Sequence, residues 1–330
     1  MALGYRAPLY LMAFDHRGSF EHDLFGGKGP SVPQARAGDS RAKPAGGPSD
    51  TVRAGIIDAK NLIYEGFVQA LERGAPRDAA GVLVDEEFGT QVARAASAAG
   101  HVLAMPVEKS GQEEFEFAYG EDFAAHIERF GPTFAKVLVR YNPDGDQDLN
   151  ARQTQRLAQL SAWLHDTERR FLFELLVPST DDQWTRCGGD QGRYDRELRP
   201  DLVVRAVEAL QDADVEPDIW KIEGLDTANA CARVVAQARA GGRDDVCCVV
   251  LGRGADEALV EQWLRIAAGV PGFDGFAVGR TLWEDALRAW LAGTVTRDHA
   301  ATAIADRYLA LIHTFLTASD ASVLASSERS

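Results

Sequence analysis

The sequence predicts a single-domain (β/α)8 TIM barrel, and three observations carry this prediction. Eight short apolar segments alternate with longer amphipathic segments along the 330 residues, which is typical of βαβ units that build a parallel sheet. Hydrophobic residues make up 45% of the chain and charged residues 26%, a globular composition. The first apolar segment runs into Asp15-His16-Arg17 and not into a glycine-rich phosphate turn, so a doubly wound open sheet is the weaker alternative.

Each predicted strand is a short apolar run. In chain order the eight runs are Leu9–Phe14, Gly81–Asp85, His101–Pro106, Phe134–Tyr141, Arg170–Pro178, Pro217–Gly224, Val246–Gly252 and Gly275–Arg280. The predicted helices have apolar residues at helical spacing. They are Val52–Arg73, Thr90–Ala99, Glu121–Arg129, Asn150–Thr167, Pro200–Asp212, Thr227–Arg239, Asp256–Ala268, Trp283–Ala292 and Arg297–Leu316.

Two segments do not follow this alternation of strands and helices, so we expect the barrel itself to span residues 1–318. Residues 26–50 are rich in Gly, Pro, Ser and Ala, which predicts a flexible insertion after the first strand. It is either a tolerated surface loop or a lid over the site. Residues 319–330 predict a disordered tail.

Charge and composition exclude several function classes. The chain has 35 Lys and Arg against 50 Asp and Glu, a net charge of −15, and phosphate-backbone binding needs a basic surface, so we expect no nucleic-acid partner. No segment approaches the roughly 18 apolar residues of a membrane span, and no export signal is recognisable. The four cysteines lack metal spacing. We therefore expect a cytoplasmic protein with reduced thiols.

Cofactor motifs are also absent from the sequence. The seven histidines are scattered without an H-E-x-x-H pattern, and no G-x-G-x-x-G follows a predicted strand. We expect neither a metal nor another cofactor. Oligomeric state stays open, because apolar residues near the C-terminus belong either to the core or to a homo-oligomer interface. These residues are Trp290, Leu291, Leu309 and Leu311.

Ionisable residues interrupt several predicted strands. Because strand side chains alternate between two faces, Lys221 lies opposite the Trp220 face that suits packing against helices, and we expect it inside the barrel. The same alternation places Lys136 and Glu174 inside, and Asp15 ends the first strand. An unpaired buried ammonium costs several kcal/mol. The cluster therefore predicts either a functional site or a buried ion pair without chemistry.

Burial and a like-charged neighbour both lower a lysine pKa. A neutral amine attacks a carbonyl group and forms a Schiff base. We therefore expect one of the two interior lysines, Lys136 or Lys221, to be a Schiff-base nucleophile.

Two Gly-Arg pairs predict a phosphate site. Gly252-Arg253 follows the seventh strand and Gly279-Arg280 follows the eighth, the two places where barrels often bind phosphate. Glycine lets backbone N–H groups approach an anion, and arginine offers a bidentate fork.

Short motifs at the strand ends suggest a family. They are Phe14-Asp15-His16-Arg17-Gly18, Leu83-Val84-Asp85-Glu86-Glu87-Phe88-Gly89, Glu108-Lys109-Ser110-Gly111, Lys136-Val137-Leu138, Phe173-Glu174-Leu175-Leu176, Trp220-Lys221-Ile222-Glu223 and Gly279-Arg280. With them, the chain resembles the class I tagatose-1,6-bisphosphate aldolase family. It resembles most the aldolase-type domain of the bacterial inositol-catabolism kinase, which is associated with 2-deoxy-5-keto-gluconate 6-phosphate.

The resemblance implies roles for individual residues. Lys221 forms the Schiff base, and Glu174 and Lys136 are its proton-handling neighbours. Asp15 and Arg17 belong to the substrate pocket. Arg280, with the Gly279 backbone, holds phosphate.

The chain also departs from the tagatose-type pattern. His16 stands where that family has Gln, and Leu251-Gly252-Arg253 where it has a small hydroxyl residue. These departures disfavour a plain hexose bisphosphate as substrate. His16, Arg17 and Arg253 are the candidates to bind a substrate carboxylate.

The expected function is a metal-independent class I aldolase of carbohydrate metabolism. It would cleave 2-deoxy-5-keto-gluconate 6-phosphate, from inositol catabolism, to dihydroxyacetone phosphate and malonate semialdehyde. Two alternatives stay open. One is a class I aldolase for a tagatose or fructose bisphosphate or a sulfonated ketose phosphate. The other is a non-catalytic regulatory protein that binds a sugar phosphate.

Overall fold

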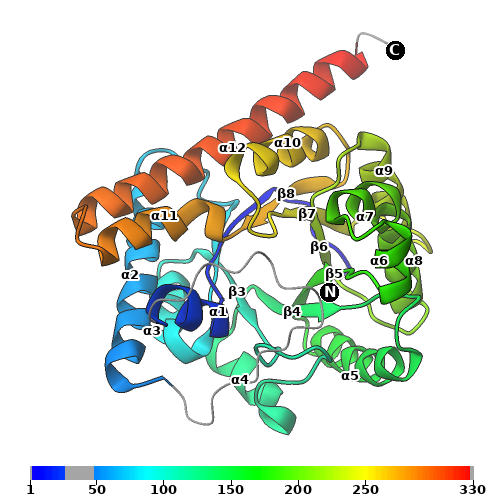
Figure 1. Ribbon diagram of the computed structural model, residues 1–330, viewed down its shortest axis with the longest axis horizontal. Helices are drawn as coiled ribbons and strands as arrows, with labels where there is room; N and C mark the ends of the chain where they lie inside the picture. The colour runs from blue at the N-terminus through cyan, green and yellow to red at the C-terminus, as the bar shows by residue number, and fades with distance from the viewer. Residues whose placement is uncertain (1, 27–47, 328–330) are drawn as a thin grey trace.

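Eight parallel strands form a closed barrel in the order β1 to β8, and helices surround it (Figure 1). The structure, a computed structural model, describes residues 2–26 and 48–327. The predicted TIM barrel is confirmed. Most of the predicted insertion, residues 27–47, lies outside the described residues.

The strands follow the predicted runs with end shifts of at most two residues. They are β1 (Leu9–Ala13), β2 (Ala80–Leu83), β3 (Val102–Pro106), β4 (Phe134–Arg140), β5 (Arg170–Leu176), β6 (Ile219–Glu223), β7 (Cys247–Leu251) and β8 (Phe273–Val278).

The helices include all nine predicted ones and several short ones that were not predicted. They are α1 (Gly18–Phe20), the π-helix η1 (Glu21–Phe25), α2 (Asp50–Glu72), α3 (Glu86–Ala98), the 3-10 helix η2 (Gly120–Asp122), α4 (Phe123–Phe130), α5 (Gln147–Asp166), α6 (Asp181–Arg186), α7 (Gln191–Glu197), α8 (Arg199–Gln211), α9 (Ala228–Ala238), α10 (Glu257–Ala268), α11 (Arg280–Leu291) and α12 (Arg297–Ser327).

Many helices begin at a side chain that accepts a hydrogen bond from the first turn, which satisfies N–H groups that have no partner within the helix. These N-cap residues are Ser49, Asp85, Asp146, Thr180, Asp190, Thr227 and Asp256. Helix α11 differs, because its N-cap is Gly279 and no side chain caps it. The Leu282 N–H donates to the Gly279 carbonyl oxygen at 2.8 Å, and among the described residues no partner is seen for the N–H groups of Arg280 and Thr281, a pair that suits an anion.

Two apolar layers hold the barrel. The larger lies between the strands and the surrounding helices and includes Tyr10, Phe173 and Trp220. The smaller fills the barrel interior and includes Phe134, Leu172 and Ile219. The two layers alternate along each strand, as the pleat requires.

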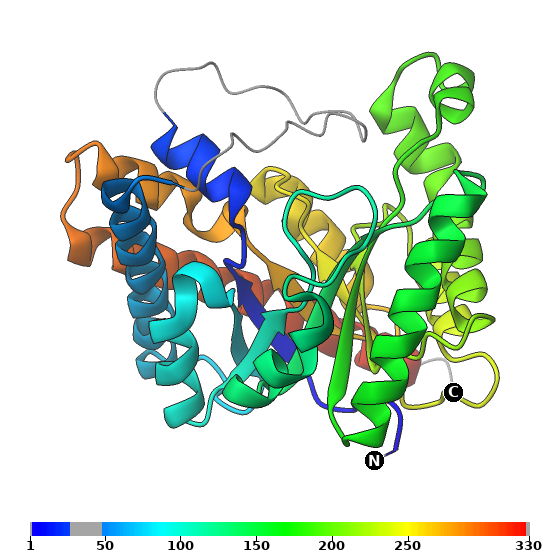
Figure 2. The same ribbon diagram turned by 90° about the horizontal axis from the view of Figure 1, so that it is seen from below.

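Short helices rise from the end of the barrel where the strands have their carboxyl termini. Helices α1 and η1 follow β1, and α6 and α7 follow β5 on the opposite side of the barrel (Figure 2). This is the end that carries active sites in barrels of this kind.

Two expectations concern the C-terminal region, the end of the ordered barrel and the burial of four apolar residues. Helix α12 continues to Ser327, beyond residue 318, where we expected the ordered barrel to end. Leu311 is buried in the core, whereas Leu291 is 40% exposed. Trp290 and Leu309 are partly buried against the core.

Candidate active site

A charged layer lies directly above the apolar interior of the barrel. Phe134, Leu172 and Ile219 are fully buried inside it. Because every second side chain of a strand shares a face, the residues two positions further on also point inward. Those residues are Lys136, Glu174 and Lys221, so the predicted cluster is brought together.

Lys136 lies at the centre of this layer and is 1% exposed. Its Nζ is 2.8 Å from Asp15 Oδ2, 2.9 Å from Glu108 Oε1 and 2.9 Å from Glu174 Oε2. Burial alone would lower the pKa of Lys136, but the three carboxylates hold it well above its ordinary value. The expectation of a lowered pKa is therefore wrong for Lys136, which stays an ammonium.

Lys221 has a simpler environment. It is 3% exposed, and its Nζ is 3.0 Å from Glu174 Oε2, the same oxygen that contacts Lys136. Burial would raise the pKa of Glu174, but Lys136 and Lys221 lower it. Glu174 therefore lies between the two lysines as a carboxylate.

Asp15 and His16 follow β1 and face the same layer. Burial would raise the pKa of Asp15, but Lys136 and His16 hold it well below its ordinary range. Burial lowers the pKa of His16 to about 4, although Asp15 opposes this shift. Nδ1 of the neutral His16 ring is buried without a hydrogen-bond partner among the described residues.

A buried lysine fixes the backbone on either side of Asp15. Lys60 of α2 donates hydrogen bonds to the carbonyl oxygens of Phe14 at 2.6 Å and His16 at 3.0 Å. It also pairs with Asp85, whose other oxygen accepts the N–H of Phe88 at the start of α3. Sequence reasoning missed Lys60, since a lone lysine in a long helix usually faces solvent.

Arg17 lies beside Glu108, which sequence reasoning also missed as a site residue. Arg17 Nη2 donates to the Glu108 carbonyl oxygen at 2.7 Å and is 3.6 Å from Oε1 of its carboxylate. Strand alternation could have found Glu108, because Ala104 lies in the interior cluster and Glu108 is four residues further on.

The two predicted phosphate loops meet at the barrel mouth. Gly254, at φ 65°, lies against Arg280, because a Cβ at Gly254 would be only 2.4 Å from Arg280 Nη2. Gly279 lies against the ring of His16. Within the described part of the chain, no carboxylate pairs with Arg280, so its guanidinium has no competing anion beside the start of α11. Gly252 is buried at the end of β7.

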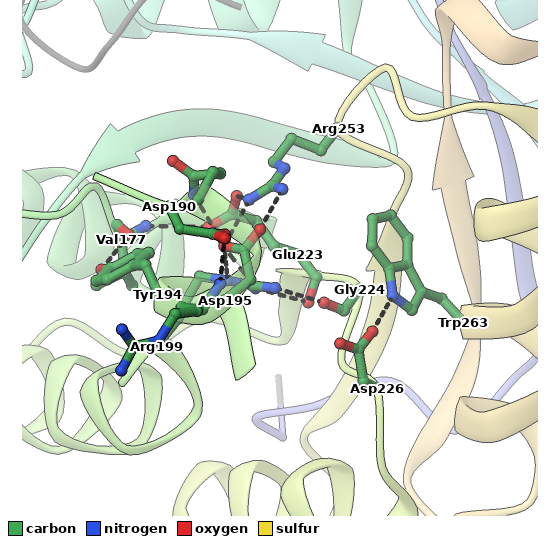
Figure 3. Close-up of polar contacts among 12 residues, drawn as sticks. Val177, Asp190, Tyr194, Asp195, Arg199, Glu223, Gly224, Asp226, Arg253 and Trp263 are labelled. Carbon is green, nitrogen blue, oxygen red and sulfur yellow. Dashed lines mark hydrogen bonds and ion pairs between the residues drawn. The ribbon is translucent and has the colours of Figure 1, made fainter. Parts of the chain in front are cut away.

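Arg253 is placed differently from expectation. Its guanidinium reaches Asp195 of α7 at 2.6 Å and Glu223 of β6 at 3.2 Å, and Arg199 donates to Asp195 from another side at 2.9 Å (Figure 3). A phosphate would have to compete with two carboxylates for Arg253. Sequence reasoning missed Asp195, because it lies in a helix that was not predicted.

Three further observations concern ligands and membranes. Among the described residues, no three His, Cys, Asp or Glu side chains are grouped to hold a metal ion. No helix in that part of the chain is long and apolar enough to cross a membrane. A groove of about 430 Å³ lies away from the charged layer, between α5 and α8, and is lined by residues such as Tyr141 and Ala209.

Comparison with known proteins identifies the family. Residues 49–319 match a family described as an uncharacterized protein conserved in bacteria, DUF2090. The chain belongs to this family. No curated protein matches it. The DUF2090 description states no activity, so the family by itself assigns none.

Solved structures with the same fold include fructose-bisphosphate aldolases. Fructose-bisphosphate aldolase from Plasmodium falciparum is 12% identical, with a TM-score of 0.62 over 96% of this chain and 98% of that one. A Schiff-base-forming fructose-1,6-bisphosphate aldolase is 14% identical, with a TM-score of 0.51 over 91% and 94%. Cgl0159 from Corynebacterium glutamicum is 18% identical, with a TM-score of 0.55 over 95% and 88%. This DUF2090 protein thus has the barrel fold of class I aldolases.

Proposed function

We propose that this protein is a metal-independent class I aldolase, and that Lys221 is its Schiff-base nucleophile. The observation that carries the proposal is the contact between Lys221 Nζ and Glu174 Oε2 at 3.0 Å, inside the barrel. A nucleophilic amine needs an adjacent group that moves protons. Lys136 is less suited to attack a carbonyl, because three carboxylates keep it charged.

The proposed reaction begins when the Lys221 amine adds to the ketone of the substrate. Glu174 moves the protons that carbinolamine formation and loss of water require, and general acid–base help of this kind contributes roughly 10²–10⁴-fold. The resulting iminium accepts the electrons of the neighbouring carbon–carbon bond as that bond breaks. Protonation and hydrolysis of the enamine then release the ketone product and return Lys221.

The proposed substrate is a phosphorylated keto-sugar acid, 2-deoxy-5-keto-gluconate 6-phosphate, with dihydroxyacetone phosphate and malonate semialdehyde as products. Arg280, Gly279 and the uncapped start of α11 support a phosphate at one end. Arg17 supports a substrate carboxylate near the end of β1, whereas His16, whose ring lies against Gly279, belongs to the phosphate end. Arg253 would bind the substrate only after its ion pair with Asp195 or Glu223 breaks.

A substrate panel tests the proposal. The wild type and Lys221→Met are incubated with 2-deoxy-5-keto-gluconate 6-phosphate, tagatose and fructose bisphosphates and a sulfonated ketose phosphate, and released dihydroxyacetone phosphate is measured. We expect the keto-sugar acid to be cleaved fastest and Lys221→Met to be inactive but folded. Cleavage of none of them would leave the non-catalytic sugar-phosphate-binding alternative, and turnover by Lys221→Met would contradict the assigned nucleophile.

A further inference from the structure

Glu108 is a member of the charged layer that the proposed reaction does not yet use. It is 6% exposed, and its Oε1 accepts a hydrogen bond from Lys136 at 2.9 Å. Its Oε2 is buried and has no hydrogen-bond partner among the described residues. A buried carboxyl oxygen without a partner costs free energy, so its place in the site suggests a ligand that completes it.

The backbone around Glu108 is held rigidly. The residue pairs with Phe117 in an antiparallel bridge, and the Val107 N–H donates to the Lys136 carbonyl oxygen at 2.8 Å. The Ala118 N–H in turn donates to the carbonyl oxygen of Val107 at 2.8 Å. The carboxyl group is therefore fixed beside Lys136, as an acid–base group must be.

The carboxyl groups of Glu174 and Glu108 differ in their contacts with the two lysines. Glu174 Oε2 contacts both Lys221 and Lys136, whereas Glu108 contacts Lys136 and, among the described residues, forms no ion pair with Lys221. Retro-aldol cleavage also needs proton transfer at two places. One is the amine nitrogen, and the other is the hydroxyl on the second carbon from the ketone. Glu174 suits the first place and Glu108 suits the second.

We infer that Glu108 is the base that takes the hydroxyl proton as the carbon–carbon bond breaks, an inference that rests on the proposed function. The O–H proton passes to Oε2, and the O–H electrons form the carbonyl of the leaving aldehyde. The electrons of the carbon–carbon bond move to the iminium and give the enamine. The enamine carbon then takes up a proton and Glu108 releases one, so the cycle neither gains nor loses a proton overall.

The charged groups facing Glu108 agree with this role. They are Lys136 of β4, with Arg17 and Asp15 after β1. Burial raises the pKa of Glu108 and outweighs the opposing effect of Lys136 and Arg17. Asp15 is the weaker candidate, because its pKa is held well below the ordinary range and it would bind the hydroxyl proton poorly.

The test separates Schiff-base formation from cleavage. Glu108→Gln keeps the size of the side chain and an acceptor for Lys136 but cannot take up a proton. Three rates are measured: borohydride trapping with dihydroxyacetone phosphate, exchange of its carbon-bound proton in deuterium oxide, and its condensation with malonate semialdehyde or glyceraldehyde 3-phosphate. Condensation is the reverse of cleavage and uses the same group. Glu116→Gln is the matched control, since Glu116 lies in the same loop and pairs with Lys109 at the surface.

We expect Glu108→Gln to trap and exchange at near wild-type rates while condensation falls roughly 10²–10⁴-fold, with Glu116→Gln unchanged. Equal loss of all three rates would mean that Glu108 only supports the site, and this overturns the inference. So would unchanged condensation, or the selective loss appearing in Asp15→Asn instead. A wild type that neither traps nor exchanges overturns the proposed function as well, and one that exchanges but condenses with neither aldehyde overturns the proposed cleavage together with the role of Glu108.

Discussion

Lys136 and Lys221 differ in the number of carboxylates that contact them, and this difference assigns their roles. Lys136 contacts Asp15, Glu108 and Glu174, whereas Lys221 contacts Glu174. Removing one partner from a buried network of ion pairs is strongly destabilising. Lys136 therefore holds the three carboxylates together, and we propose Lys221, which pairs with Glu174, as the attacking amine.

At the residue scale, His16 gives the protein a predictable dependence on pH. Its pKa is lowered to about 4 in the folded chain, by burial and by Arg280 and Lys60 against the attraction of Asp15, and is about 6.5 when unfolded. Between these values the unfolded state binds the proton that the folded state does not. The contribution of His16 is therefore complete above about pH 6.5 and is lost as pH falls toward 4, by roughly 3 kcal/mol in all.

Urea unfolding at pH 7.5 and pH 4.5 measures this effect in the wild type and in His16→Gln, which has no titrating ring. We expect the wild type to lose more unfolding free energy between the two pH values than the variant does. Equal losses would show that His16 does not titrate in this range.

At the element scale, the junction of β1, β2 and α2 depends on one buried ion pair. Lys60 of α2 binds the carbonyl oxygens of Phe14 and His16, and Asp85 at the end of β2 binds Lys60 and caps α3. The pair thereby fixes the turn that presents Asp15 to Lys136. A structural ion pair at this point serves the site indirectly.

Lys60→Met should lower the unfolding free energy by about 3–5 kcal/mol, because it leaves Asp85 buried without its partner. Arg73→Met is the control, since Arg73 at the end of the same helix pairs with Asp306 at the surface, and exposed pairs contribute about 0–1 kcal/mol. Chemical denaturation of both variants checks the contrast. Equal costs would remove Lys60 from this role.

Hydrophobic periodicity was sufficient to predict the eight strands and the long helices in their order, because each strand is a short apolar run between amphipathic helices, but it missed short helices such as α6 and α7. Alternation also placed Lys136, Glu174 and Lys221 together. Continued past the end of β3 it also reaches Glu108, four residues after Ala104, but the predicted strand stopped at Pro106. Arg253 bonds to Asp195, which is 58 residues away in the sequence, and Lys60 bonds to Asp85, which is 25 residues away. Only the folded arrangement shows such contacts.

At the scale of the whole molecule, closure of the barrel is the condition for the site, since β1 supplies Asp15 and β8 leads to Arg280. The two strands pair with Leu9 opposite Gly275. Gly275 has φ 150°, and a Cβ there would lie 1.9 Å from the carbonyl oxygen of Leu9. Only glycine fits at this seam.

Gly275→Ala should therefore destabilise the barrel by roughly 3 kcal/mol. Gly74→Ala is the matched control, because Gly74 has φ 108° but nothing lies within 4 Å of its position. The control variant has the backbone strain without the steric clash, and we expect its unfolding free energy to fall by about 1 kcal/mol. Thermal and urea unfolding compare the two, and similar costs would contradict the role of the seam.

The most direct test of the account is borohydride reduction of the wild-type protein in the presence of dihydroxyacetone phosphate, followed by mass mapping of the peptides. With Lys221 as the Schiff-base nucleophile, we expect one reduced adduct, on Lys221, and none in Lys221→Met. An adduct on Lys136, or no adduct at all, would contradict it.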